Sequence, residues 1–103
     1  MHTLLILNVA PELEEELVDC LLELPTVNGF STHQVYGHGV NGRMTMAEQV
    51  SGRRKRLQVE LIVEAQAVKP ILAAVREIGA SGLYWEHPVH NFGRLKPVPQ
   101  ELG

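Results

Sequence analysis

The segment from Thr3 to Val9 (TLLILNV) constrains the fold most, because it is apolar on both of its faces. It has the length of a buried strand, and successive side chains of a strand point to opposite sides of a sheet. The odd-numbered and even-numbered apolar positions therefore face opposite ways: Leu5, Leu7 and Val9 against Leu4 and Ile6. A sheet built around this strand needs a cover on both faces.

Five further elements follow this strand. A helix begins at Pro11, where a missing N–H costs nothing, and stops at Pro25. Two strands are predicted over residues 30–38 and 57–63, the second from its alternating apolar pattern. A second helix stops at Gly79, and a last strand covers residues 83–92, where Pro88 indicates an edge position or a bulge.

The order strand, helix, strand, strand, helix, strand predicts a single α+β domain over residues 1–103. Its fold class is a ferredoxin-like βαββαβ sandwich, an antiparallel four-stranded sheet with two helices on one face. Those helices cover only one face, whereas the first strand is apolar on both. An exposed apolar face of this extent normally marks an interface. We therefore expect a homo-oligomer that packs its sheets together.

The segment from residue 35 to residue 56 (VYGHGVNGRMTMAEQVSGRRKR) holds five of the nine basic residues, whereas six of the twelve acidic residues fall in the first predicted helix. The basic segment could attract an anion despite the formal net charge of −3, or it could be a solvated strand entrance. Loops of this length inside a compact domain are usually functional or disordered. We expect a flexible sensing loop over about 39–52 and a loose tail over 96–103.

Several classes of protein are disfavoured. No sequence motif of a hydrolase, a zinc protease or a P-loop enzyme occurs, so we expect no enzymatic activity. Nucleic acid is not expected as a partner, because no aromatic residues are interleaved with the basic run. The first residues lack a basic region followed by a long apolar run, which favours a cytoplasmic protein. Cys20, the single cysteine, is predicted to be a core thiol.

The sequence resembles the PII superfamily of signalling proteins, and within it a small PII-like group of bacterial proteins without a settled activity. The resemblance rests on five segments: Tyr36-Gly37-His38-Gly39, Leu57 to Val63, Ala47 to Arg53, Tyr84 to Val89, and Gly93-Arg94-Leu95. It implies a homotrimer with projecting loops and ligands in the clefts between subunits. It also implies a partner that reads the loop, such as a membrane transporter or an efflux pump, since some members are associated with heavy-metal efflux.

One segment departs from this resemblance. Nucleotide-binding PII proteins carry a glycine-rich run with an aspartate and a lysine before the last strand, and that run wraps the phosphates. Here the corresponding residues are Gly79-Ala80-Ser81-Gly82-Leu83, without an acid or a lysine. Nucleotide binding is therefore not implied, although arginines elsewhere could meet phosphates. The cofactor stays open between a nucleotide and a divalent metal.

Candidate ligand-binding residues lie around the loop and near the end of the chain. Guanidinium groups suit phosphate and carboxylate, and of two adjacent arginines on a strand only one can face a given cleft. The candidates are Gly37, His38, Gly39, Arg43, Arg53, Arg54 and Arg94.

Five histidines give a second candidate site. Imidazole suits zinc, copper and nickel, so His38, His87 and His90 form a candidate metal site. The alternative is that these histidines are surface or hydrogen-bonded residues. Three functions therefore remain open: a ligand-sensing regulator of the PII type, a histidine-based metal-binding accessory protein, and a scaffolding oligomer without a ligand.

Overall fold

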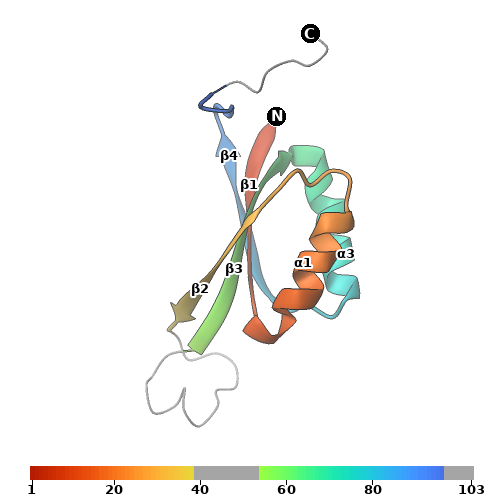
Figure 1. Cartoon of the computed structure of the whole chain (residues 1–103), viewed down its shortest axis with the longest axis vertical. Coiled ribbons are helices and arrows are strands. Elements are labelled where there is room, and N and C mark those ends of the chain that lie inside the picture. The colour runs from red at the N-terminus through yellow and green to blue at the C-terminus, as the bar shows by residue number, and fades with distance from the viewer. Residues whose placement is uncertain (39–53, 97–103) are drawn as a thin grey trace.

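A computed structural model describes residues 1–38 and 54–96, and its elements follow the predicted order. Its strands are β1 (His2–Val9), β2 (Ser31–Gly37), β3 (Arg54–Glu64) and β4 (Gly82–Val89). The helices α1 (Glu14–Glu23) and α3 (Val68–Glu77) each follow a short 3-10 turn, η1 (Pro11–Leu13) and η2 (Ala65–Ala67). The sheet is antiparallel in the order β2-β3-β1-β4, and both helices lie against one face (Figure 1). The predicted ferredoxin-like sandwich is confirmed.

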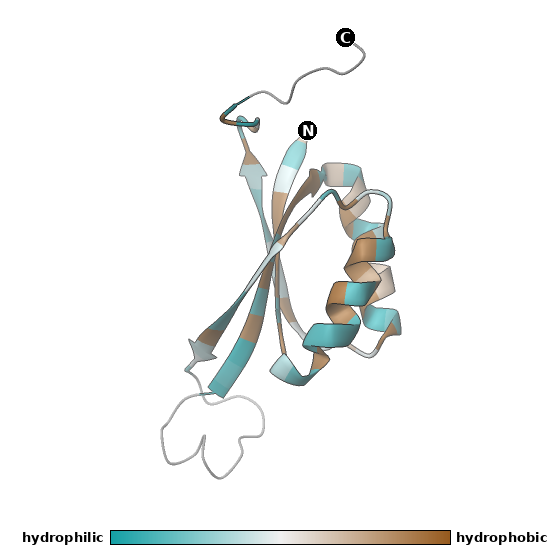
Figure 2. Cartoon of the chain, in the orientation of Figure 1, coloured by the Kyte–Doolittle hydropathy of each residue, from teal (hydrophilic) through white to brown (hydrophobic). Residues whose placement is uncertain are grey.

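The core lies between the helices and one face of the sheet. Leu5 of β1 is paired with Leu61 of β3, and both side chains are almost completely buried. Apolar residues, brown in Figure 2, alternate with hydrophilic ones along the helices that cover this pair. The helices contribute Leu17, Leu21 and Ile71, each 0% exposed. Burial of an amphipathic stripe from each helix is what holds the two layers together.

The observed strand ends differ from the predicted ones for a common reason, the availability of a pairing partner. β3 begins at Arg54 instead of residue 57, because antiparallel pairing with β2 continues to Gly37 opposite Arg54. β4 ends at Val89 instead of residue 92, because Val89 pairs with His2 at the beginning of β1. Pro88 lies in β4, an outer strand of the sheet, as its sequence position indicated.

Cys20 is more exposed than the sequence predicts. The prediction of a core thiol is wrong, because Cys20 is only half-buried and lies beside the core residues Leu17 and Leu21 on α1. Successive side chains on a helix point about 100° apart, so Cys20 lies at the edge of the stripe that buries Leu17 and Leu21. Burial is still the largest cause that raises the pKa of the Cys20 thiol, and the nearby carboxylates of Glu23 and Glu77 raise it further.

Candidate functional site

Four strand ends meet at one end of the sheet. β1 ends at Val9 opposite Gly82, where β4 begins, and β2 ends at Gly37 opposite Arg54, where β3 begins. β1 and β3 are paired with Val9 opposite Leu57, so both pairs of ends lie at the same end of the sheet, and the Gly37–Arg54 pair extends three residues beyond Val9 (Figure 1). The two residues that flank segment 39–53, His38 and Arg54, are therefore at the same end of the sheet as the turn that precedes β4. We call five residues here the loop-end junction: Asn8, Gly37, Arg54, Arg56 and Gly82.

The side chain of Arg56 organises this junction. Its Nε donates a hydrogen bond to Asn8 Oδ1 at 3.0 Å, and its Nη2 donates to the backbone oxygen of Asn8 at 3.2 Å. Asn8 also uses its amide nitrogen, which lies 3.5 Å from Gln58 Oε1. The half-buried guanidinium group thus binds one residue through two separate atoms, which fixes its orientation.

Gly82 makes room for this arrangement. A Cβ atom at position 82 would lie 2.2 Å from the backbone oxygen of Asn8 and 2.8 Å from Arg56 Nη2. Its φ of +143° is also a backbone conformation that residues with a side chain rarely adopt. Only glycine therefore lets the beginning of β4 approach the end of β1 and the arginine this closely.

A cavity of about 310 Å³ adjoins the junction. Its apolar lining comes from β1 and α3, and includes Leu7, Val9 and Val75. Arg76 and Tyr84 also line it, with the guanidinium carbon of Arg76 6.0 Å from the centre of the tyrosine ring. A ligand here would meet an apolar wall beside the guanidinium group of Arg76, and Gly82 connects the cavity to the junction.

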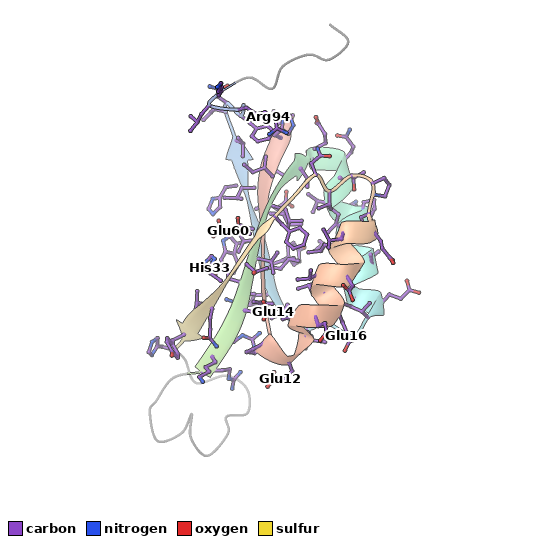
Figure 3. The ribbon with its side chains drawn as sticks, viewed as in Figure 1. Glu12, Glu14, Glu16, His33, Glu60 and Arg94 are labelled. Carbon is purple, nitrogen blue, oxygen red and sulfur yellow. The ribbon has the colours of Figure 1, made fainter. Side chains whose placement is uncertain are left out.

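Charge at this end of the molecule is divided between the two layers. Arg54, Lys55 and Arg56 begin β3 in the sheet. The acidic residues at the beginning of α1 lie at the same end but in the helical layer, where Figure 3 labels Glu12, Glu14 and Glu16. An anion approaching the strand ends therefore meets positive charge on the sheet side and is repelled on the helix side.

The structure brings some of the predicted ligand residues together. Gly37 and Arg54 are paired in the junction, and His38 follows directly after β2. Gly39, Arg43 and Arg53 lie outside the described residues, as does the predicted flexible loop over 39–52. Arg94 lies at the opposite end of the sheet, beyond the end of β4 (Figure 3). There it lines a wide cavity of about 980 Å³ together with His2 and Glu64. Within one subunit, Arg94 is thus separate from the junction.

The three histidines of the predicted metal site lie apart in one subunit. His38 follows the edge strand β2 at the junction end, whereas His87 is in β4, the opposite edge strand, paired with Leu4. His90 lies beyond β4, toward the far end of the sheet. Within residues 1–38 and 54–96, no three side chains of histidine, cysteine, aspartate or glutamate gather closely enough to hold a metal ion.

The sheet face that carries no helices is partly apolar. Leu4, Ile6, Ile62 and Trp85 fall on this face, where Leu4 is paired with Ile62 and Ile6 with Trp85. A polar pair flanks them, with His33 Nε2 3.8 Å from Glu60 Oε2. Figure 3 labels both residues. Ile6 is only 6% exposed, but the other three are half-buried. This open face remains partly uncovered in a single chain.

The far end of the sheet holds a small ionic cluster. The α-ammonium group of Met1 donates a hydrogen bond to Glu64 Oε2 at 3.1 Å, and His2 Nε2 lies 3.3 Å from Glu64 Oε1. The hydrogen bond from the ammonium group is the main cause that lowers the pKa of Glu64 below its usual value. The charge of His2 lowers this pKa further.

Sequence reasoning missed Asn8, Arg56 and Gly82 as members of the site. Asn8 was assigned only to the end of a strand, and Arg56 only to the basic run. A signal was present, because a polar residue interrupting an apolar strand needs a hydrogen-bond partner when it is partly buried. Which of the four basic residues at 53–56 supplies that partner depends on strand register, which periodicity alone did not give.

The family "Protein of unknown function (DUF3240)" matches residues 1–96. The chain belongs to this family. A crystal structure of a DUF3240 family protein from Shewanella baltica OS155 is 23% identical, with a TM-score of 0.72, and the alignment covers 92% of this chain and 97% of that one. No curated protein matches the chain.

Two PII-like structures are also similar. The structure of GlnK from B. subtilis is 16% identical, with a TM-score of 0.65, and covers 86% of this chain and 85% of that one. The nitrogen regulatory PII-like protein CPII from Thiomonas intermedia K12, bound to ADP, AMP and bicarbonate, is 20% identical and covers 94% of each chain, again with a TM-score of 0.65. The fold is therefore PII-like, as the sequence resemblance implied. In the described part of the chain, neither helix is long and apolar enough to cross a membrane.

Proposed function

We propose that this protein is a non-enzymatic PII-like regulator that binds a small anionic ligand at the loop-end junction and signals through segment 39–53. The observation that carries the proposal is the convergence at one end of the sheet. Both ends of the segment, the basic beginning of β3 and the apolar cavity at Gly82 meet there. A ligand that contacts the strand ends would change the surroundings of both ends of the segment at once.

The proposed ligand has an anionic group and a less polar part. Arg54 supplies a guanidinium group at the beginning of β3, and the cavity beside Gly82 supplies an apolar wall and the guanidinium group of Arg76. The turn before β4 contains no lysine or aspartate, so any phosphate contacts would come from the arginines and from backbone N–H groups. The ADP, AMP and bicarbonate of the CPII structure are the first ligands to test on this basis.

The proposed assembly is a homotrimer in which the open faces pack around the symmetry axis. Leu4, Ile62 and Trp85 are half-buried there without a covering layer, and burial of apolar surface is the main driving force for association. The junction would then border a neighbouring subunit, and the ligand would lie in the cleft between them. A partner protein would recognise segment 39–53, and we propose a membrane transporter or an efflux pump as this partner.

Calorimetric titration of wild-type protein and two variants tests this function. Each ligand (AMP, ADP or bicarbonate) would be added separately to Arg54→Ala and to Lys69→Ala, which removes the same charge at the other end of the molecule. We expect at least one ligand to bind, and Arg54→Ala to weaken it by about ten- to a hundredfold, because a charge-assisted hydrogen bond contributes roughly 1.5–3 kcal/mol. Lys69→Ala should leave the affinity nearly unchanged.

Two results would reject the proposed function. Absence of binding by all three ligands would exclude these anions, and equal losses in both variants would mean that only net charge matters. The same samples titrated with zinc and copper test the histidine hypothesis. Metal binding that disappears in His87→Ala/His90→Ala protein would favour the metal-binding accessory function over the anion sensor.

A further inference from the structure

The side chain of Arg56 connects all four strands at the junction. It originates in β3, and its guanidinium group binds Asn8 at the end of β1 through Nε and Nη2. Its Cγ lies 3.4 Å from the position that a Cβ atom on residue 37 would take, so its stem runs alongside the end of β2. Its Nη2 lies 2.8 Å from the position that a Cβ atom on residue 82 would take, at the beginning of β4.

We propose that Arg56 is a positioning residue that couples the end of β2 and the beginning of β3, which flank segment 39–53, to the turn before β4. The inference deepens the proposed function and rests on it, because the coupling matters if a ligand occupies the junction. A ligand that displaces the backbone at Gly82 must displace the guanidinium group, and with it the beginning of β3 and the end of β2. Arg56 is thus the physical link between the turn and the segment.

The chemistry requires an arginine at this position. The guanidinium group presents donors in a rigid planar fork, so Nε and Nη2 can reach Asn8 Oδ1 and the Asn8 backbone oxygen together. A lysine carries the same charge on a flexible stem and offers a single nitrogen atom. Arg56→Lys therefore separates the effect of geometry from the effect of charge. Arg54→Lys, two residues earlier on the same face of β3, is the matched control.

The glycines provide a second and independent test. Gly79 and Gly82 both have positive φ, at +91° and +143°, so alanine is strained at either position. Only at position 82 would the new Cβ atom also meet Asn8 and Arg56, since nothing lies within 4 Å of a Cβ atom at position 79. Gly79→Ala is thus the control for backbone strain, and Gly82→Ala adds a clash with the backbone oxygen of Asn8 and with the guanidinium group that is bonded to it.

Hydrogen exchange of the ligand-free protein measures the coupling. The amides to follow are those of residues 35–37 and 82–84 that bond to a neighbouring strand. We expect Arg56→Lys to speed exchange about tenfold in both groups, a change that corresponds to roughly 1.4 kcal/mol. Gly82→Ala should also affect both groups, including residues 35–37, which it does not touch directly. Arg54→Lys and Gly79→Ala should leave at least one of the two groups unchanged.

The outcome that overturns the inference is a local response. If Arg56→Lys speeds exchange in β3 alone, or matches Arg54→Lys, the arginine does not couple the strand ends. Because the experiment needs no ligand, its result is independent of the titration with AMP, ADP and bicarbonate. Coupled exchange without ligand binding would retain Arg56 as the link and reject the proposed ligand. Ligand binding without coupled exchange would retain the proposed ligand and reject Arg56 as the link.

Discussion

Glu64 shows how a single exposed side chain can make stability depend on pH. The α-ammonium group of Met1 and the ring of His2 both contact its carboxylate, and they lower its pKa below the usual value. A carboxyl group whose pKa is lower in the folded state stabilises the fold above its unfolded pKa. That contribution is lost as the pH falls through the folded pKa. We expect acetylation of Met1 to raise the pKa of Glu64 toward its usual value, as measured by NMR titration of the side-chain carboxyl.

The control for this prediction is the Glu64→Gln variant. Acetylation should shift the acid unfolding midpoint slightly upward in the wild type, because the ammonium group no longer stabilises the ionised carboxylate. The shift should vanish in Glu64→Gln protein, which has no carboxylate at this position. An unchanged pKa of Glu64 after acetylation would mean that the 3.1 Å contact does not persist in solution.

Helix α1 offers a matched pair of leucines for testing the layer interface. Leu21 is 0% exposed and Leu22 is 66% exposed, although the two are adjacent in the sequence. We expect Leu21→Ala to lower the free energy of unfolding by about 2–5 kcal/mol, because it leaves a cavity in the core. Leu22→Ala should change it by no more than about 0.5 kcal/mol. Chemical unfolding at one fixed protein concentration measures both, and equal losses would contradict the observed orientation of α1.

The elements were predictable from sequence because their signals are local. Pro11 and Pro25 bound the first helix, and Leu24 has the extended backbone (ψ of 124°) that a residue before proline prefers. Apolar alternation located β3, but its basic beginning has no apolar pattern, so pairing with β2 decided where the strand starts. The junction was only partly predictable for the same reason. Arg54 was found from its charge, whereas Asn8 and Gly82 join the site through contacts between distant residues.

On the scale of the whole molecule, the open face of the sheet stays partly uncovered in a single chain. Apolar residues occupy its centre, at Leu4, Ile6, Ile62 and Trp85. Ionic and polar residues surround them, including the pairs His2–Glu64 and His33–Glu60. An apolar centre with a polar rim is the usual composition of a protein interface. The sequence of the first strand already indicated this requirement, because it is apolar on both faces and both helices of this fold cover the same face.

The homotrimer is tested by placing a charge at the centre of this face. Leu4 is half-buried and paired with Ile62, so Leu4→Lys would place an ammonium group between packed sheets, where a charge without a partner is strongly unfavourable. Light scattering should give three times the subunit mass for the wild type and a lower mass for Leu4→Lys. Leu22→Lys, on the exposed side of α1, should keep the mass of the wild type. Circular dichroism of each variant would show whether the subunit remains folded.

A wild type that is monomeric at micromolar concentration would reject the trimer and, with it, the binding cleft between subunits. A folded Leu4→Lys trimer would instead move the interface to a different surface.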